Sequence, residues 1–383
     1  MRRRLALLVA AAALVLAAPA PAVTEPPPVQ ARAALVANGA TGEVLYSRNA
    51  SRRLPPASIT KLMTALVAVD RAKPQATVAV SPVATSVGES SVDLRAGERL
   101  PLRDLLAAAL VQSANDAAYA IAAHVGRGNV RAFVRLMNAR ARLLGLAETR
   151  FVRPDGLDTP GHYSSARDVL ALARAAMQKP LLRRLVRLRS ARIAGGRVLF
   201  SWNDLLASFP GLVGVKTGHT SGAGWCQVAL ARRDGVPIYA VILGSPSRTQ
   251  RNRDLRELLE WGLAQYARVA VVEPGRTYAR ATVPFSEDRL RLLAAARARA
   301  VVSVDRPLVE RVRAPSVVEL PLESRERVGE IEVREGRRIV ARVPLVAARA
   351  VSEPGLRDRV RWYAARTLDE AGAVLEDVFG AVL

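Results

Sequence analysis

Alternating apolar and polar positions predict a hairpin and a series of helices in the first part of the chain. Two short apolar runs, 33–37 and 43–46, flank the letters NGATG, a pattern typical of a β-hairpin. Later segments have apolar residues at spacings of three and four, which predicts helices. These expected helices cover 59–69, 102–112, 117–125, 130–144 and 166–177.

Two more strands and a helix complete this region. The strands cover 224–231 and 236–243 and flank the turn sequence RDG. The helix is expected over 254–266. Strands at both ends of a helical middle predict an α+β domain over 32–268, in which helices pack on an antiparallel sheet.

The pattern changes after residue 268. Short runs of alternating residues predict strands at 277–283, 301–305, 317–322, 329–333 and 339–343. Together they predict a small all-β domain over 269–353. The final segment, 354–383, has apolar residues every three to five positions, which predicts an amphipathic helix.

The first residues are expected to direct export. Three arginines at 2–4 precede an uncharged apolar run over 5–18, and small residues follow at 20 and 22. This order is typical of a secretory signal peptide over 1–22, followed here by a Pro-rich tether over 23–31. The apolar run is short for a spanning helix, which needs about 20 residues. We therefore expect the mature protein to work outside the cytoplasm.

The charge of the chain is strongly positive. Its 383 residues include 57 Lys and Arg against 34 Asp and Glu, a net charge of +23, and half of the residues are hydrophobic, which excludes a disordered chain. Outside the cytoplasm the available polyanions are lipid headgroups and acidic wall polymers, so nucleic acid is not an expected partner. Among the basic residues the only lysines are Lys61, Lys73, Lys179 and Lys216. Lysine, unlike arginine, can give up its proton.

The cysteine and histidine content gives no sign of a disulfide or a metal site. Cys226 is the only cysteine, so no internal disulfide can form, and its apolar neighbours predict a buried thiol. The histidines at 124, 162 and 219 are scattered along the chain. No metal and no cofactor are expected.

Ser58 and Lys61 form a Ser-x-x-Lys motif at the start of the first expected helix. Residues three apart on a helix have Cβ atoms about 5–6 Å apart, so Lys61 can reach the Ser58 hydroxyl. A serine becomes a nucleophile when a neighbouring base takes its proton, and burial or a nearby cation such as Lys216 lowers a lysine's pKa for that role. Alone, the motif is weak and more often marks a helix-capping serine beside a solvated lysine.

Ser113 and Asn115 form a second motif, between two expected helices. The serine hydroxyl can relay a proton to a leaving amine, and the asparagine amide can hold a substrate amide. Both residues are also ordinary helix caps. The motif therefore gains meaning only from its neighbours.

A third motif, Lys216-Thr217-Gly218, precedes the strand at 224. An ammonium and a hydroxyl suit a substrate carboxylate, and the glycine lets a ligand approach the backbone. The same letters also fit a β-bulge or turn beside a surface lysine. The three motifs in this order are the set found in class A β-lactamases and penicillin-binding proteins.

With these motifs the sequence resembles the low-molecular-mass penicillin-binding proteins that are serine-type D-alanyl-D-alanine carboxypeptidases. The resemblance spans roughly 32–350 and rests on PASITKLMT at 56–64, SANDAA at 113–118, GLD at 156–158, YSSARD at 163–168 and GVKTGHT at 214–220. It implies a β-lactamase/transpeptidase-like catalytic domain, then a small β domain and a terminal helix. It also implies removal of the terminal D-alanine from peptidoglycan pentapeptide stems through an acyl-enzyme, and covalent inhibition by β-lactams such as penicillin.

The resemblance further implies roles for single residues. Ser58 would be the acylated nucleophile and Lys61 its base, while Ser113 and Lys216 pass the proton to the departing D-alanine. The backbone N–H groups of Ser58 and His219 would form the oxyanion hole. The substrate-binding residues implied are Asn115, Lys216, Thr217, Gly218, His219 through its backbone, and Arg251. Because the chain is rich in arginine, Arg251 also fits an ordinary arginine with no role in the site.

Two of the matching segments have a second interpretation. Asp155 stands where some relatives have a histidine tied to deacylation, but the letters PDG also fit a simple turn. The YSSARD segment is interpreted as structural, with Ser164 or Ser165 capping the next helix and Asp168 pairing with an arginine.

The terminal helix over 354–383 also has two interpretations. As a membrane-surface helix it would bind anionic headgroups at the outer face of the cytoplasmic membrane, which the four arginines between 357 and 366 favour. The four acids between 369 and 377 favour packing on the β domain instead. The resemblance favours the membrane-surface interpretation. If the helix does not bind a membrane, the exported protein is expected in the periplasm or the cell-wall space.

Three alternatives to a carboxypeptidase stay open. A β-lactamase on the same fold would turn over penicillin rapidly, although the chain lacks a Glu-x-x-Leu-Asn motif for fast deacylation. A D,D-endopeptidase would cut cross-links with the same residues. A non-enzymatic wall-binding or membrane-associated scaffold would use only the positive charge, and Ser58→Ala would leave its binding intact.

Overall fold

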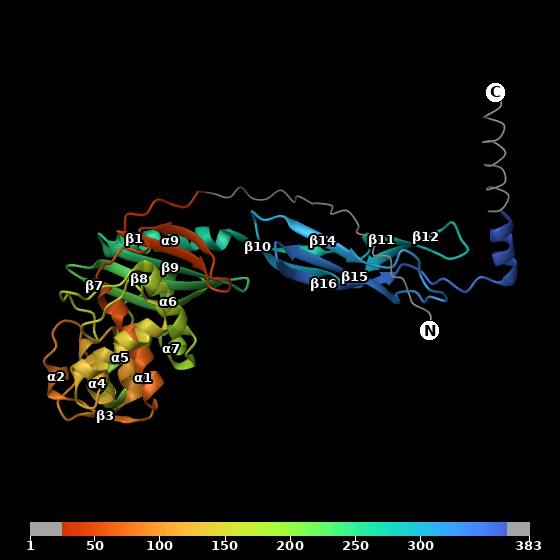
Figure 1. The fold of residues 1–383 in the computed structure, drawn as a ribbon. Helices are drawn as coiled ribbons and strands as arrows, with labels where there is room; N and C mark the ends of the chain where they lie inside the picture. Colours follow the sequence, from red (N-terminus) through yellow and green to blue (C-terminus); the bar gives the residue numbers. More distant parts are fainter. Residues whose placement is uncertain (1–24, 366–383) are drawn as a thin grey trace. The chain divides into compact units, whose positions relative to one another are not determined.

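The computed structural model describes residues 25–365 (Figure 1). Contacts divide the chain into two compact units, the first ending at Gln265 and the second beginning at Tyr266. The boundary expected from the sequence lay slightly later, between residues 268 and 269. The signal peptide expected over 1–22 lies outside the described residues.

The first unit is built on one antiparallel sheet. Its strands are β1 (Ala33–Asn38), β2 (Val44–Arg48), β7 (Leu212–Thr220), β8 (Gly224–Arg233) and β9 (Val236–Ser245). Within residues 25–265 these five strands stand in the order β2-β1-β9-β8-β7. β1 and β2 form the predicted hairpin, and β7 is an edge strand that pairs only with β8.

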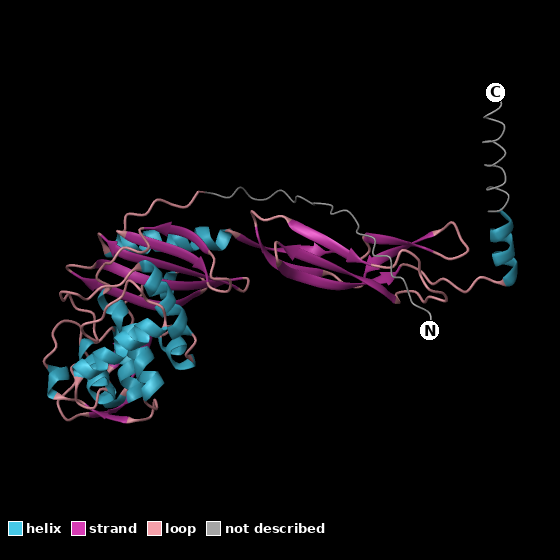
Figure 2. Cartoon of the chain, viewed as in Figure 1, coloured by secondary structure: helices cyan, strands magenta, loops and turns pink. Residues whose placement is uncertain are grey.

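Helices cover both faces of this sheet (Figure 2). On one face lies α9 (Arg248–Ala264), which packs closely at Gly262, because a Cβ atom there would lie 2.9 Å from Ile238 and 3.0 Å from Val36. On the other face, Leu35 and its alternate neighbours join the main hydrophobic core together with α6 (Ala166–Met177). Because successive strand side chains point to opposite faces, β1 and β9 are buried along their whole length.

The other helices of the first unit pack beside the sheet. They are α1 (Lys61–Arg71), α2 (Pro82–Thr85), α3 (Leu102–Ala107), α4 (Asn115–Val125), α5 (Val130–Leu143), α7 (Pro180–Leu185) and α8 (Leu205–Ser208). A 3-10 helix over Ala57–Thr60 precedes α1, and a π-helical turn over Ala108–Gln112 follows α3. Two small hairpins complete the unit, β3 (Thr77–Ala79) with β4 (Arg99–Pro101) and β5 (Ser190–Arg192) with β6 (Val198–Phe200).

The second unit is built from strands, as the alternation after residue 268 predicted. Its strands are β10 (Tyr266–Val272), β11 (Thr277–Thr282), β12 (Arg289–Ala294), β13 (Ala298–Ser303), β14 (Leu308–Arg313), β15 (Arg327–Glu335) and β16 (Arg338–Ala347). In the described part of this unit, β11-β12-β16-β15-β14 form one sheet and β10-β13 pair separately. Leu292, Ile331 and Leu345 are buried in its own core. The α+β fold predicted for the chain is confirmed.

Some elements differ from the sequence prediction. α9 begins at Arg248 rather than at 254, because its first turns are polar and show no apolar period, although Ser247 caps it by accepting the N–H of Gln250. The strands at β12 and β14 were not predicted, since arginines interrupt their apolar residues. The run 317–322 forms only isolated bridges at Val317 and Leu322.

The terminal helix is described only in its first part. Residues 356–365 are helical, and the remainder of the predicted helix over 354–383 lies outside the described residues. Between residues 25 and 365, no helix has the length and apolar character needed to cross a membrane.

Candidate active site

Ser58 lies on the 3-10 helix in front of α1, not within the α-helix itself. Its neighbour Ala57 has a left-handed φ of 49°. The carbonyl of Ala57 is covered by Gly156, where a Cβ atom would lie 2.0 Å from that oxygen. The helix start has no side-chain cap, so the alternative in which Ser58 is a capping residue is wrong.

Lys61 reaches Ser58 as the three-residue spacing predicted. Its Nζ donates to Ser58 Oγ at 2.8 Å, to Asn115 Oδ1 at 2.6 Å and to the carbonyl oxygen of Asp155 at 2.9 Å. The side chain is fully buried, so it is not the solvated lysine of the alternative interpretation. The bonds to Asn115 and to the carbonyl of Asp155 hold the Lys61 amine beside the Ser58 hydroxyl.

Burial determines the protonation of Lys61. It lowers the pKa of Lys61 to about 8, partly opposed by the carboxylate of Asp155 and assisted by the cation of Arg153. The sequence pointed to Lys216 as the assisting cation, whereas Arg153 has that role here. A lysine with this pKa is neutral in about a tenth of the molecules at pH 7, far more than an ordinary lysine, and the neutral amine is the form that a general base requires.

Ser113 and Asn115 stand where the π-helical turn meets α4. Ser113 has a left-handed φ of 68°, which turns the chain between the two helices. Its Oγ accepts a hydrogen bond from Lys216 Nζ at 3.0 Å, while Asn115 Oδ1 accepts from Lys61. The second motif therefore links both lysines, although its members lie far from them in sequence.

The third motif lies on the edge strand β7. Thr217 faces the cavity, whereas the Lys216 amine lies behind Ser113 and also donates to the carbonyl of Thr217. Adjacent strand residues point to opposite sides, so the two do not act side by side as the sequence suggested. Gly218 lets β7 approach the nucleophile, because a Cβ there would lie 3.0 Å from the Ser58 nitrogen.

Lys216 shares its environment with Lys61. Burial lowers the pKa of Lys216 well below its ordinary value, and repulsion from Lys61 and Arg251 lowers it further. The charge of Lys61 therefore disfavours the charged form of Lys216. A carboxylate bound nearby would favour the charged form again.

Arg251 comes from α9 and is almost entirely buried. It contacts Asp204 at 3.2 Å and stacks over the Trp225 ring, with 5.5 Å from Cζ to the centroid. Burial lowers its pKa to about 10. Arg251 still lines the cavity, so the structure brings it to the other predicted residues.

These residues surround one cavity of about 260 Å³. The predicted residues that line it are Ser58, Ser113, Asn115, Thr217, Gly218, His219 and Arg251. Sequence reasoning missed five more, which are Glu89, Ser90, Trp202, Trp225 and Arg248. None of these five belongs to a recognisable spacing, so the sequence carried no signal that could have found them.

A buried network lies beneath Lys61. The carboxylate of Asp155 is fully buried and receives two hydrogen bonds from Arg153, at 2.5 and 2.8 Å. His162 bonds to Thr60 at 2.9 Å and accepts the N–H of Val152, and burial lowers its pKa to about 4, so the ring is neutral. Asp155 is therefore more than a turn residue, because its backbone and side chain both shape the surroundings of Lys61.

In the YSSARD segment, one of the two expected structural roles is found. Ser165 caps α6 by accepting the N–H of Asp168. Asp168 pairs with no arginine between residues 25 and 365, contrary to what the sequence suggested. Its carboxylate accepts from the Glu148 N–H and the Thr149 hydroxyl instead.

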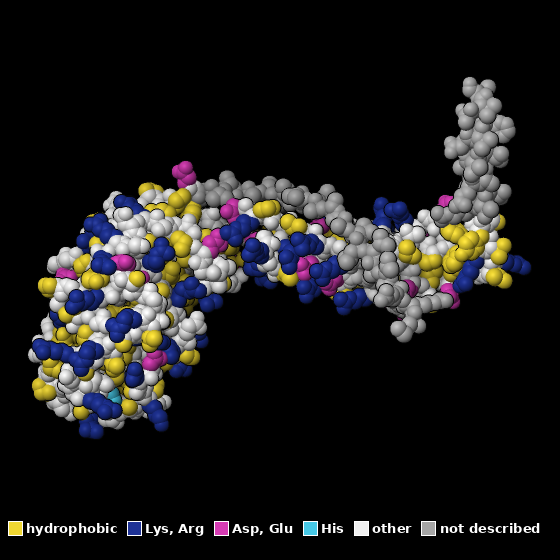
Figure 3. Space-filling view, in the orientation of Figure 1, with side chains coloured by type: hydrophobic (Ala, Val, Ile, Leu, Met, Phe, Trp, Pro, Cys, Tyr) yellow, Lys and Arg dark blue, Asp and Glu magenta, His cyan; other side chains and the backbone are white. Residues whose placement is uncertain are grey.

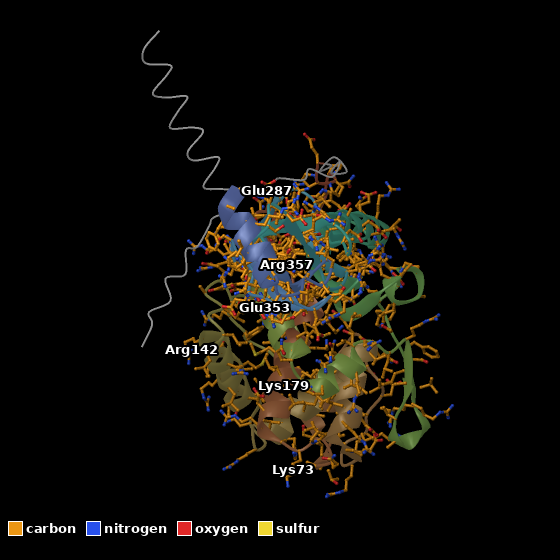
Figure 4. All side chains as sticks on the ribbon, turned by 90° about the vertical axis from the view of Figure 1, so that its right-hand side faces the viewer. Lys73, Arg142, Lys179, Glu287, Glu353 and Arg357 are labelled. Carbon is orange, nitrogen blue, oxygen red and sulfur yellow. The ribbon has the colours of Figure 1, made fainter. Side chains whose placement is uncertain are left out.

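The other two lysines, both labelled in Figure 4, are not among the residues that line the cavity. Lys73 is exposed, and Lys179 pairs with Asp70 at 2.6 Å. Cys226 is buried, and burial raises the pKa of its thiol to about 11. No group of His, Cys, Asp and Glu between residues 25 and 365 is arranged to hold a metal ion.

Comparison of the sequence with known proteins gives one consistent result. Residues 20–247 match a family model described as D-alanyl-D-alanine carboxypeptidase. The D-alanyl-D-alanine carboxypeptidase DacD of Salmonella typhimurium is 30% identical and covers 88% of this chain and 91% of its own length. DacC of Escherichia coli is 31% identical and covers 88% of both chains.

Solved structures of three related proteins match different shares of this chain. Penicillin binding protein 5 from Haemophilus influenzae covers 86% of this chain and 100% of its own, with a TM-score of 0.63 and 26% identity. The Streptomyces K15 DD-transpeptidase covers 63% of this chain and 100% of its own, with a TM-score of 0.60 and 30% identity. Penicillin-binding protein D2 from Listeria monocytogenes, solved in an ampicillin-bound form, has a TM-score of 0.56 and 31% identity over 61% of this chain and 98% of its own.

Proposed function

Because the chain belongs to the D-alanyl-D-alanine carboxypeptidase family, we propose that its cavity carries out that family's reaction on Ser58. The protein is a serine-type carboxypeptidase, a hydrolase that releases D-alanine from a D-alanyl-D-alanine terminus. We assign peptidoglycan stem peptides as its substrates and β-lactams as its covalent inhibitors. The single observation that carries the residue assignment is Lys61 Nζ, held 2.8 Å from Ser58 Oγ and 2.6 Å from Asn115 Oδ1.

Acylation begins at Ser58. Neutral Lys61 takes the hydroxyl proton while Ser58 Oγ attacks the carbonyl of the penultimate D-alanine, because the carbonyl of Asp155 and Asn115 Oδ1 hold the amine in line with the serine. The backbone N–H groups of Ser58 and His219 receive the developing oxyanion. The approach of β7 at Gly218 to the Ser58 nitrogen supports this placement.

The leaving D-alanine needs a proton on its nitrogen. Ser113 Oγ faces the cavity and is hydrogen-bonded to Lys216 Nζ at 3.0 Å. Ser113 can therefore donate its proton to the amine and recover one from Lys216. Water then attacks the acyl-enzyme and loses one proton to Lys216 through Ser113, which restores the charge that Lys216 gave up. As the ester bond breaks, Lys61 returns to Ser58 Oγ the proton that it took during acylation, and the product leaves as a carboxylic acid.

The substrate carboxylate is bound at the other end of the cavity. Thr217 offers a hydroxyl and Arg251 a guanidinium, and both line the same cavity as Ser58. Lys216 contributes its charge from behind Ser113. This division of labour replaces the direct contact of Lys216 with the carboxylate that the sequence suggested.

The test is release of D-alanine from an acyl-D-alanyl-D-alanine peptide, with labelled penicillin as a second readout. Wild-type protein should release D-alanine and retain the label, and Ser58→Ala should do neither. Ser51→Ala, at an exposed serine outside the cavity, is the matched control. Absence of D-alanine release from the wild type would overturn the proposal, and rapid turnover of penicillin would indicate a β-lactamase instead.

We further propose that the protein is exported and lies at a membrane surface. The signal-like segment over 1–22 supports export. In the described part of the terminal helix, Leu356, Val360 and Tyr363 are 79%, 59% and 58% exposed, at spacings of four and three. Figure 3 shows apolar side chains gathered at this end of the chain, and Arg357 lies on the same helix (Figure 4).

An aromatic cluster extends this apolar end. The rings of Phe285, Trp362 and Tyr363 lie edge to face, with centroids 5.2–5.9 Å apart. Phe285 belongs to the loop between β11 and β12, so loop and helix present apolar groups together. Aromatic and aliphatic groups beside arginines are suited to the interface of an anionic bilayer.

A further inference from the structure

The cavity holds a carboxylate that neither the proposed mechanism nor the family motifs use. Glu89 is exposed, and among the described residues that line the cavity it is the only acid. Its side chain forms no hydrogen bond or ion pair with another residue between 25 and 365. In a chain with 57 basic residues, an acid without a partner at the active site is unexpected.

The backbone around Glu89 is attached to Asn115. The carbonyl of Gly88 accepts from Asn115 Nδ2 at 3.0 Å, and the carbonyl of Ser90 accepts from the Asn115 N–H at 2.7 Å. Glu89 stands between them with a left-handed φ of 65°, which is uncommon for a residue other than glycine. The loop after α2 therefore holds Glu89 at a defined place beside the substrate-binding asparagine.

Glu89 lies on the Asn115 side of the cavity, because the carbonyls of both its chain neighbours accept hydrogen bonds from Asn115. A bound peptide has its C-terminal carboxylate near Arg251 and its scissile carbonyl at Ser58. The residue before D-alanyl-D-alanine must then lie on the Asn115 side of Ser58.

We propose that Glu89 is a specificity-determining residue that binds an ammonium group on the side chain of the residue preceding D-alanyl-D-alanine. This inference rests on the proposed function and adds the class of substrate that the site prefers. An exposed carboxylate–ammonium pair contributes little energy, so a preference of about two- to fivefold is expected. The preference weakens at high salt, which screens exposed charges.

The experiment compares two peptides that differ by one charge. Nα-acetyl-L-lysyl-D-alanyl-D-alanine carries the ammonium, and its Nε-acetylated counterpart does not. The measured quantity is the ratio of the two kcat/KM values for D-alanine release, at about 0.01 M and about 1 M salt. Wild-type protein should favour the first peptide about two- to fivefold at low salt, and the ratio should approach one at high salt.

Three variants separate the charge of Glu89 from other effects. Glu89→Gln should bring the ratio close to one, and Glu89→Asp, which keeps the charge and tolerates a left-handed backbone, should retain a preference. Glu257→Gln removes the same charge from the exposed side of α9, outside the cavity, and should keep the wild-type ratio. Thermal unfolding of each variant checks that the fold is preserved.

Each outcome has a distinct meaning. Equal kcat/KM values for the wild type, or a preference that persists in Glu89→Gln, would overturn the assignment of Glu89 and leave the carboxypeptidase function standing. Loss of the preference in Glu257→Gln as well would attribute it to overall charge and also overturn the assignment. Release of no D-alanine from either peptide would overturn the proposed function, and this inference with it.

Discussion

At the scale of single residues, two lysines distinguish the site from the arginine-rich remainder of the chain. Lys61 and Lys216 are buried with their amines on two serine hydroxyls. Burial disfavours the charged form of both, and this is the property that arginine cannot supply. Of the remaining lysines, Lys73 is exposed and Lys179 forms an ion pair with Asp70.

The first residue-scale prediction concerns pH. Because the pKa of Lys61 is lowered to about 8, the amine is protonated and unable to act as a base at lower pH. The rate of acylation by labelled penicillin should rise about tenfold per pH unit well below this value and level off above it. A rate independent of pH between 6 and 9 would contradict the role of Lys61 as base.

The second residue-scale prediction is that Lys61→Arg loses the base while retaining the positive charge. A general base contributes about 10²- to 10⁴-fold to a rate, so acylation of Ser58 should slow by at least about a hundredfold. Lys73→Arg makes the same exchange at an exposed position and should acylate at the wild-type rate. Both are measured with labelled penicillin under single-turnover conditions.

At the scale of elements, the site depends on close approaches of backbone. The edge strand β7 meets the 3-10 helix at Gly218, and the loop after α5 meets it at Gly156. These contacts fix the position of Ser58 from two sides. A side chain at Gly218 would push β7 away from the 3-10 helix, and one at Gly156 would push the loop after α5 away from it.

The element-scale prediction tests the second approach. Gly156→Ala places a Cβ atom 2.0 Å from the Ala57 carbonyl at a φ of +93°, so both strain and a clash follow. We expect the free energy of unfolding to fall by more than the about 1–2 kcal/mol of the left-handed backbone alone, and acylation of Ser58 to slow. Gly128→Ala has a φ of +83° with open space around the Cβ, so it should show the backbone cost alone. Equal unfolding midpoints in urea for the two variants would contradict a steric role for Gly156.

At the scale of the whole molecule, the candidate catalytic residues and the proposed membrane-binding surface belong to different units. All of the candidate catalytic residues lie before Gln265, and the apolar helix and the aromatic cluster lie after Tyr266. The Streptomyces K15 DD-transpeptidase matches only 63% of this chain with its entire length.

The molecule-scale prediction concerns membrane binding. Wild-type protein should sediment with vesicles that contain anionic phospholipid, less so at high salt, and Leu356→Glu combined with Val360→Glu should reduce the bound fraction several-fold. Val317→Glu, at an exposed apolar residue elsewhere in the second unit, should bind as the wild type does. All three proteins should release D-alanine from a soluble peptide equally, and equal binding by the double variant would contradict the proposed surface.

The sequence by itself determined the local features of this protein. The pair Ser58 and Lys61 lie three residues apart on one turn, so their contact follows from helix geometry. The hairpin of β1 and β2 and most helices follow from the apolar period. The polar start of α9 and the arginine-interrupted strands β12 and β14 escaped prediction because their apolar pattern is weak.

Only the tertiary structure decided how distant residues act on one another. Lys61 meets Asn115 across 54 residues and the carbonyl of Asp155 across 94, and Lys216 meets Ser113 across 103. Burial, which no local pattern measures, moves the pKa of both lysines. Glu89 has no motif around it, and only the packing of its loop against Asn115 brings its carboxylate to the cavity, because long-range contacts depend on the whole fold rather than on neighbours in the chain.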